Sequence, residues 1–422
     1  MSVLLGLGSN LEDRRGNLEK ALGALSELTG TSLVRCSTAY ESEALLEPES
    51  PSAWNRPYLN VAVELSTSMQ PHDLLAATQQ IEKRLGRDKA ERWAPRIIDI
   101  DILAYHDELI TTNDLIIPHV GVCERSFVLS PLAEIVPSRR LPGRTETLLQ
   151  LKRRIKEPLP AWMSVVNVTP DSFSDGGRWF KNDESGNMHS ELLAGNYIDV
   201  GGESTRPGAV DVDPEMEWRR VAPVLEQLDQ QYSGRLLRPK ISIDTRSPTT
   251  AARAIEAGAS IVNDVSGLAD PAMIDVIVDS GCDVILMHSL SVPADPGNVL
   301  PPDVDPLVTL HSWFAKMLDK LCRAGIAIDR VIIDPGIGFG KTATQSLEII
   351  RRARELMDLD CRLLFGHSRK SFLEPMTKVP PNQRDPETLA VSARLASLGV
   401  DILRVHTLDF HRRFWRVYQR AV

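Results

Sequence analysis

Disulfide-forming cysteine pairs, an excess of basic charge and long apolar runs are all missing from this 422-residue sequence. Its five cysteines are scattered without a C-x-x-C pair, which favours reduced core thiols over a disulfide framework or a zinc site. A net charge of -9 argues against sequence-independent binding to nucleic acid, because such binding needs a basic face. No apolar run approaches the ~20 residues of a membrane span, and no signal peptide is recognisable. These absences predict a cytoplasmic protein without nucleic-acid or membrane partners.

The length and composition predict two globular domains. A chain of 422 residues is long for one core, and 42% hydrophobic with 25% charged residues is ordinary for a globular protein. The first part alternates strand-like and helix-like segments in the order β-α-β-β-α-β, which predicts a ferredoxin-like α+β sandwich. The expected strands cover 3–8, 32–40, 58–65 and 98–105, and the expected helices cover 14–29, 72–85 and 127–135.

The second part carries eight short apolar runs that alternate with helical stretches, which predicts a (βα)₈ TIM barrel over residues 161–422. The runs are 164–167, 197–201, 241–244, 260–263, 284–288, 330–334, 362–366 and 402–406. An open doubly wound sheet is the alternative, but the G-x-G-x-x-G turn typical of such a sheet is missing after the first strand. Polar, proline-punctuated residues 138–160 are expected to link the barrel to a first domain over 1–137, with one or two helical turns within the linker.

The densest chemical cluster is GRDKAERWAPRIIDIDIL, residues 86–103. Asp99 and Asp101 stand two apart on a predicted strand, so their side chains leave the same face. Two adjacent carboxylates cost free energy, which a Mg²⁺ shared with phosphate oxygens would offset. Neighbouring cationic groups, which a phosphoryl-transfer site needs, are Arg87, Lys89, Arg92, Arg96, His119 and Arg125. A lone D-x-D would more simply be a solvated pair; the basic surroundings favour a metal clamp.

Residues 1–137 resemble 6-hydroxymethyl-7,8-dihydropterin pyrophosphokinase. The motifs that carry the likeness are GLGSN, YLNVAV, ERWAPRIIDIDIL and PH(x)₅RSFVLxPL. The resemblance implies pyrophosphate transfer from ATP to the hydroxymethyl group of the pterin, with two Mg²⁺ ions held by Asp99 and Asp101. It implies catalytic roles for Arg87 and Arg96. It assigns Tyr58, Asn60, Trp93 and Phe127 to the pterin, and Gln79, Glu82, Lys89, His119 and Arg125 to ATP.

This first half departs from the family pattern at three places. Lys89 stands where the family often has arginine, which gives a point charge without a bidentate fork. Ala94 replaces a common glycine, and residues 41–55 lack the usual proline-rich pterin loop. No metal ligand is lost, so we expect altered loop closure with activity retained.

The predicted barrel strands end in polar residues, where barrel enzymes place their active sites. They are Asn167, Glu203, Thr205, Arg206, Asp244, Asn263, His288, Asp334, Lys370, Arg404 and His406. Buried aspartates and asparagines suit a ring with alternating donors and acceptors. Arg206, Arg404 and His406 suit an oxyanion. Taken singly, a strand-end aspartate is as readily a helix N-cap, and His288 is more simply a packed core residue.

Residues 161–422 resemble dihydropteroate synthase through seven ordered motifs: NVTPDSFSDGG, DVGGESTRPGA, SIDT, IVNDVSG, DPGIGFGK, GHSRKSF and RVH. The resemblance implies condensation of dihydropterin pyrophosphate with p-aminobenzoate to give 7,8-dihydropteroate and pyrophosphate. It assigns substrate binding to Thr205, Arg206, Asp244, Asn263, Met287, Asp334, Phe339, Lys370, Ser371, Arg404 and His406. Lys370, Arg404 and His406 would be catalytic, and Asn167 would lie near a Mg²⁺ bound with pyrophosphate.

Three expectations remain open at this level. Residues 178–196 are short and polar where the family has a full helix, which places the first barrel loop in question. One half could have become a scaffold, or the barrel could bind a pterin for methyl transfer; the D-x-D pair and the S-R-K and R-V-H motifs favour two synthetic activities. Homodimerisation through the barrel is a family-level expectation.

Overall fold

The computed structural model describes residues 2–87, 93–156, 158–168, 195–205 and 208–421. The chain divides into two compact units. The first comprises Met1–Leu159 with Gly234–Arg238, and the second comprises Pro160–Ser233 with Pro239–Val422. Within the described residues, no helix is both long and apolar enough to cross a membrane.

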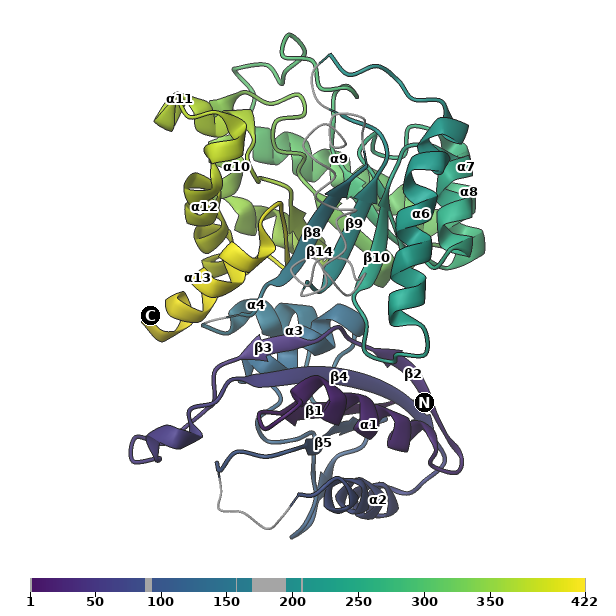
Figure 1. The fold of residues 1–422 in the computed structure, drawn as a ribbon, viewed down its shortest axis with the longest axis vertical. Coiled ribbons are helices and arrows are strands. Elements are labelled where there is room, and N and C mark those ends of the chain that lie inside the picture. Colours follow the sequence, from purple (N-terminus) through teal and green to yellow (C-terminus); the bar gives the residue numbers. More distant parts are fainter. Residues whose placement is uncertain (1, 88–92, 157, 169–194, 206–207, 422) are drawn as a thin grey trace. The chain divides into compact units, whose positions relative to one another are not determined.

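The first unit is built on an antiparallel sheet in the order β2-β4-β1-β5, with β3 paired to β4 (Figure 1). Its strands are β1 (Val3–Ser9), β2 (Thr31–Cys36), β3 (Tyr40–Ser42), β4 (Tyr58–Thr67) and β5 (Asp99–Tyr105), and a hairpin of β6 (Ile110–Thr111) and β7 (Ile116–Ile117) follows. Its helices are α1 (Arg14–Ser26), η1 (Ser52–Trp54), α2 (Pro71–Arg84), α3 (Ser126–Ile135) and α4 (Leu148–Arg154). This connectivity confirms the ferredoxin-like prediction.

Strand β1 shows why the sheet is covered on both faces. Because alternate side chains leave opposite faces, Val3 and Leu5 pack in the cluster that contains Leu18 of α1. Leu4 packs in the cluster that contains Leu129 of α3. Both clusters are fully buried, so β1 is the central strand of a helix–sheet–helix sandwich.

Residues 138–159, expected to be a linker, belong to the first compact unit. Thr147 and Gln150 form a capping box that begins α4, because each side chain bonds the backbone N–H of the other. Leu148 and Leu151 then pack in the cluster formed with α3. This short helix agrees with the one or two helical turns expected within the segment.

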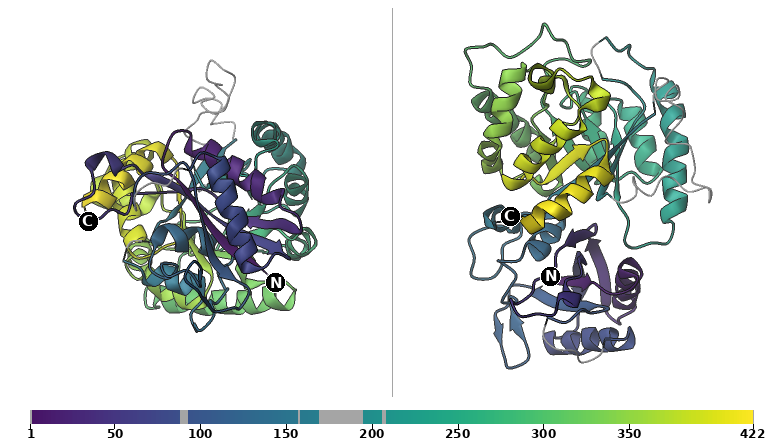
Figure 2. Two further views of the ribbon diagram at one scale, coloured as in Figure 1. Left: turned by 90° about the horizontal axis from the view of Figure 1, so that it is seen from below. Right: turned by 60° about the vertical axis from the view of Figure 1, so that its left-hand side comes forward.

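The second unit is a closed barrel of eight parallel strands in chain order (Figures 1 and 2). The strands are β8 (Ala161–Asn167), β9 (Tyr197–Gly201), β10 (Lys240–Asp244), β11 (Ile261–Asp264), β12 (Asp283–Met287), β13 (Val331–Asp334), β14 (Arg362–Phe365) and β15 (Ile402–Val405). Each coincides with a predicted apolar run, and the TIM-barrel prediction is confirmed.

Helices surround this barrel and bury the outward side chains of its strands, such as Ile198, Ile243 and Leu286. They are α6 (Pro214–Tyr232), α7 (Pro248–Glu256), α8 (Pro271–Ser280), α9 (Pro306–Arg323), α10 (Ala343–Arg351), α11 (Glu374–Thr377), α12 (Asp385–Ser397) and α13 (Leu408–Ala421). Short 3₁₀ turns are η3 (Ile328–Arg330), η4 (Ala353–Leu359), η5 (Ser371–Leu373) and η6 (Pro381–Gln383). Because side chains alternate between the two faces of a strand, the remaining side chains point inward and meet inside the barrel.

Candidate active sites

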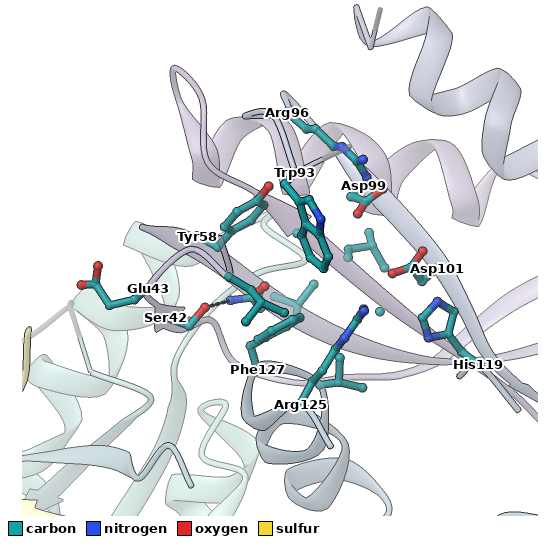
Figure 3. A pocket seen from close by; sticks show the side chains of 17 residues that line it. Ser42, Glu43, Tyr58, Trp93, Arg96, Asp99, Asp101, His119, Arg125 and Phe127 are labelled. Carbon is teal, nitrogen blue, oxygen red and sulfur yellow. Dashed lines mark hydrogen bonds and ion pairs between the residues drawn. The ribbon is translucent and has the colours of Figure 1, made fainter. Parts of the chain in front are cut away.

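A cavity of about 230 Å³ opens on the first unit where β1, β4 and β5 meet the start of α3 (Figure 3). Its lining combines aromatic rings, cationic groups and three carboxylates. The lining residues that the sequence analysis had singled out are Tyr58, Asn60, Trp93, Arg96, Asp99, Asp101, His119, Arg125 and Phe127. Residues spread over 70 positions of the chain therefore share one cavity, because the antiparallel register sets Asp99 opposite Gly8 and Asp101 opposite Gly6.

The two aspartates face the cavity together, as their spacing predicts. Asp99 Oδ1 forms an ion pair with Arg87 Nη1 at 2.7 Å and accepts a hydrogen bond from Arg96 Nη1 at 2.9 Å. Burial, and then the charge of Asp99, raise the pKa of Asp101 to about 7. A carboxylate whose ionised form is this disfavoured gains most from a nearby cation.

Glu82 lies behind the aspartate pair and holds the strand that carries it. Its buried Oε1 accepts from the backbone N–H of Ile100 at 2.8 Å, and it also pairs with Arg87. Burial raises the pKa of Glu82. Gln79, one turn earlier on α2, is exposed and does not line the cavity. Lys89 and Arg92 lie outside the described residues.

Aromatic groups and one amide form the other wall. The Asn60 amide donates to Tyr40 O at 3.2 Å and to Ser42 Oγ at 3.0 Å, so its NH₂ is committed to the protein. Its oxygen remains an acceptor near the rings. Trp93 has φ +71 and donates through Nε1 to Glu47 Oε1 at 3.0 Å.

The imidazole of His119 and the guanidinium of Arg125 complete this first site. His119 Nδ1 accepts from the Gly121 N–H at 3.1 Å, which leaves the ring proton on Nε2 when the imidazole is neutral. Burial, and then the charge of Arg125, lower the pKa of His119 and favour that neutral form. The Arg125 guanidinium lies 5.9 Å from the centre of the Phe127 ring.

Three lining residues were missed by the sequence analysis: Ser42, Glu43 and Leu45. Ser42 ends β3, Glu43 and Leu45 follow it, and all three lie in the divergent stretch 41–55. The insertion-like composition there signalled a changed loop, but no residue pattern showed which side chains would reach the cavity.

Inside the barrel, an arginine joins two carboxylates at the carboxyl ends of the strands. Arg404 Nε donates to Asp199 Oδ2 at 2.6 Å, and Arg404 Nη2 donates to Asp244 Oδ2 at 2.7 Å. Asn263 Nδ2 donates to the same oxygen of Asp199 at 3.0 Å. One N–H of the Asn263 amide is thereby used, and its other N–H and its carbonyl oxygen are left for a ligand. Asp199 is a central member that the sequence analysis quoted only within a motif.

A lysine lies across the same end of the barrel. Lys370 Nζ donates to Ile337 O at 2.5 Å and lies 4.5 Å from the centre of the Phe339 ring. Burial lowers the pKa of Lys370 to about 8, and burial raises the pKa of Asp334. Met287 and Phe339 pack together beside them.

The N-cap alternative for the strand-end aspartates is wrong at two strands. Ser247 caps α7 and Thr342 caps α10. Each side chain accepts a hydrogen bond from the backbone N–H three residues later in the chain. Asp244 and Asp334 are therefore not the caps of those helices, and their carboxylates serve the barrel interior. For His288 the simpler interpretation is supported: it is buried, with its ring edge against Trp313.

The remaining predicted residues of this unit lie at the rim. His406 Nδ1 lies 3.0 Å from Ser368 Oγ. Asn167 is the last residue of β8, Thr205 follows β9, and both are half-buried. Ser371 is exposed on η5. Arg206 and residues 178–194 lie outside the described residues.

Comparison with known proteins covers both units. The family described as 7,8-dihydro-6-hydroxymethylpterin-pyrophosphokinase matches residues 4–137, and the family described as pterin binding enzyme matches residues 163–406. The folate synthesis bifunctional protein of Chlamydia caviae is 36% identical over 97% of this chain and 96% of its own length. The chain belongs to the bifunctional folate-synthesis family.

Solved structures resemble the barrel of this bifunctional enzyme. A dihydropteroate synthase of Clostridium difficile, solved in the presence of pteroic acid, has 34% identity and a TM-score of 0.54, and the match covers 62% of this chain and 96% of that one. A Xanthomonas albilineans dihydropteroate synthase with 4-aminobenzoic acid has 35% identity and a TM-score of 0.55, covering 62% and 93%.

The chain is thus a bifunctional transferase of folate biosynthesis. Its first activity transfers pyrophosphate from ATP to 6-hydroxymethyl-7,8-dihydropterin. Its second condenses the dihydropterin pyrophosphate with p-aminobenzoate and releases pyrophosphate and 7,8-dihydropteroate. Matches over both halves favour two synthetic activities over a catalytic half joined to a scaffold.

Proposed function

We propose that the cavity of the first unit is the pyrophosphokinase site, and the observation that carries this is the shared position of Asp99 and Asp101 beside cationic groups and aromatic rings. Tyr58, Phe127 and the acceptor oxygen of Asn60 would bind the pterin, with Trp93 over it. Cationic and amide groups proposed for ATP or its transferred pyrophosphate are Arg87, Lys89, Arg96, His119, Arg125 and Gln79. Glu82 acts through Ile100 and Arg87, so its role is to position the aspartates.

The residues present fit divalent cations at this site. Burial, and then the neighbouring carboxylate of Asp99, raise the pKa of Asp101 to about 7. Hard oxygen ligands of this kind suit Mg²⁺. Two ions held by Asp99 and Asp101 would neutralise phosphate charge. Arg87 and Arg96 already contact Asp99, so they lie where they can pass from the carboxylate to phosphate oxygens when ATP binds.

For the barrel we propose that Asp244, Asn263, Asp334 and Lys370 bind the edges of the pterin ring. Asp199 holds one of the two N–H groups of the Asn263 amide, so Asn263 offers the ring its carbonyl oxygen and one N–H. Met287 and Arg404 would flank the ring, and Phe339 and Ser371 would face p-aminobenzoate.

The diphosphate would leave toward cationic and polar groups at the rim: Asn167, Thr205, Arg206, Arg404 and His406. Stabilising the departing pyrophosphate would be the largest catalytic contribution, because the pterin ring delocalises positive charge at the methylene carbon. The amine of p-aminobenzoate then forms the C–N bond as the C–O bond breaks, and its proton leaves to solvent. Asn167 fits a Mg²⁺ held mainly by pyrophosphate oxygens, since it supplies one neutral oxygen ligand.

We also propose the wider assignments made from the sequence. Residues 1–137 would carry the kinase activity, 161–422 the synthase activity, and 138–160 would connect them. The barrel would form a homodimer. A reducing cytoplasmic location is supported by the five cysteines, all of which are free thiols.

One assay tests both sites. The intact protein is supplied with hydroxymethyl-dihydropterin, ATP, Mg²⁺ and p-aminobenzoate, and AMP and dihydropteroate are measured together. Equal amounts of the two products support coupled activities. Formation of AMP without dihydropteroate, when dihydropterin pyrophosphate is also supplied directly, would refute the proposed barrel site.

A further inference from the structure

Lys341 is a buried lysine that the proposed reaction does not use. Its side chain is almost fully buried, and Nζ is surrounded by three acceptors. It lies 2.8 Å from His288 Nδ1, 3.0 Å from His288 O and 2.9 Å from Phe339 O. Three acceptors match the three N–H donors of one ammonium group, and the hydrogen bonds offset the cost of burying its charge.

These bonds join the loop after β13 to the segment after β12. The two segments touch along their backbones: a side chain on Gly336, which has φ +66, would place a Cβ 2.0 Å from His288 O. A Cβ on Gly340, which has φ +73, would lie 2.5 Å from Cγ of the Leu290 side chain. His288 N donates to Asp334 O at 3.0 Å, and Lys341 closes the loop from its other end.

The same loop carries the contacts of Lys370. Ile337 O accepts from Lys370 Nζ at 2.5 Å, and the Phe339 ring lies 4.5 Å from that nitrogen. Lys341 holds the carbonyl of Phe339 itself. Any shift of the peptide group of Phe339 would therefore move the Phe339 ring and change the contacts of Lys370 Nζ.

We infer that Lys341 is a positioning residue of the synthase reaction, which fixes Phe339 and the p-aminobenzoate side of the barrel site through three hydrogen bonds. The inference rests on the proposed roles of Phe339 and Lys370. It adds a residue that touches no substrate and acts through the loop backbone.

The arrangement also fixes the state of His288. Because Lys341 donates to Nδ1, the ring proton belongs on Nε2. Burial, and then the charge of Lys341, lower the pKa of His288 to about 3. Burial lowers the pKa of Lys341 as well, while the nearby Asp334 carboxylate opposes that shift.

The kinetic test is Lys341→Met in the full-length chain, with dihydropterin pyrophosphate and p-aminobenzoate supplied directly. We expect the KM for p-aminobenzoate to rise about tenfold, because the loop loses a charge-assisted hydrogen bond that positions Phe339. The KM for the pterin should change less. The matched control is Arg330→Met. Arg330 also clamps backbone carbonyls, those of Ile277 and Cys282, but at the opposite end of β13.

A general loss of stability would lower the melting temperature of both variants without separating the two KM values. An unchanged KM for p-aminobenzoate in Lys341→Met, or an equal rise in Arg330→Met, would overturn the inference. If the wild-type chain makes no dihydropteroate, the proposed function fails instead, and that outcome is seen before any variant is compared.

A second measurement follows the ring of His288 itself. In protein labelled with ¹⁵N-histidine, the His288 ring should keep the Nε2-protonated neutral tautomer from pH 5 to pH 9, and Lys341→Gln should release it. Titration of the wild-type His288 ring near its ordinary pKa would rule out the Lys341–His288 bond.

Discussion

Arg404 Nε donates to Asp199 Oδ2 at 2.6 Å, and Asp199 has no exposed surface. The second donor of the same guanidinium reaches Asp244. One arginine therefore neutralises two carboxylates in the barrel interior, and its planar group is held in one orientation beside the proposed pterin slot. Arg404 therefore stabilises the barrel interior and also contributes its charge to the proposed pterin site.

Replacing Arg404 by methionine should remove synthase activity and destabilise the barrel. Two carboxylates would be left buried without a counter-charge, and breaking such a pair costs about 3–5 kcal/mol. Urea unfolding monitors the loss. The double variant Arg404→Met with Asp199→Asn should regain part of the stability, since one uncompensated charge is gone; a double variant as unstable as the single one would contradict the ion-pair account.

Asp101→Ala should abolish the kinase step and leave the barrel reaction intact. Loss of a carboxylate from the aspartate pair weakens metal and phosphate binding, and removal of an electrostatic group of this kind costs about 100- to 1,000-fold in rate. AMP formation measures the first activity, and dihydropteroate formation from supplied dihydropterin pyrophosphate measures the second. Loss of both rates in a folded variant would show that the two sites are not independent.

The raised pKa of Asp101 makes the substrate-free first unit sensitive to pH. The group titrates at about 7 in the folded chain and at 3.8 when unperturbed, so the folded state binds the extra proton between these values. Stability therefore falls as pH rises from about 4 to about 7. Asp101→Asn should stabilise the first unit at pH 8, on the order of 3 kcal/mol, and have little effect at pH 4. Thermal unfolding at the two pH values checks this; equal effects at both would refute it.

Lys370 should set an alkaline limit on the synthase reaction. Burial lowers its pKa to about 8, so the ammonium group that faces the proposed pterin site is lost above that pH. The kcat/KM for dihydropterin pyrophosphate should fall as pH rises through about 8. Lys370→Arg should remove this alkaline limb, because a guanidinium stays charged. A variant with the same limb as the wild type would assign the titration to another group. Lys370→Ala should lose the synthase step and keep the kinase step.

Much of the barrel could be predicted, because each buried strand is a short apolar run that ends in a polar residue. The runs at 197–201 and 241–244 match β9 and β10 to within one residue. Asp99 and Asp101 were also predictable as a pair, since residues two apart on a strand share a face whatever surrounds them. One or two helical turns were expected within residues 138–160, but the packing of the helix Leu148–Arg154 against α3 was not, because the local sequence pattern does not show which segment covers its apolar side chains.

Partners across the barrel could not be read from the sequence. Asp199 and Arg404 are separated by 205 positions. Only closure of the sheet into a barrel brings Arg404 of β15 next to the buried carboxylate of Asp199 on β9. Glu82 resembles an ATP ligand by its position on α2, and only the packing of α2 on β5 shows it bonded to Ile100. Glu47 and Leu45 fall in a divergent loop with no periodic pattern to place them.

The sequence by itself determined the two folds and the chemical classes of the groups in each site, because apolar periodicity and local spacing act over a few residues. The tertiary structure decided which of those groups bond one another, which are buried far enough to change their pKa, and which serve as supports. Those properties depend on distances between segments that the chain brings together only when the sheet and the barrel form.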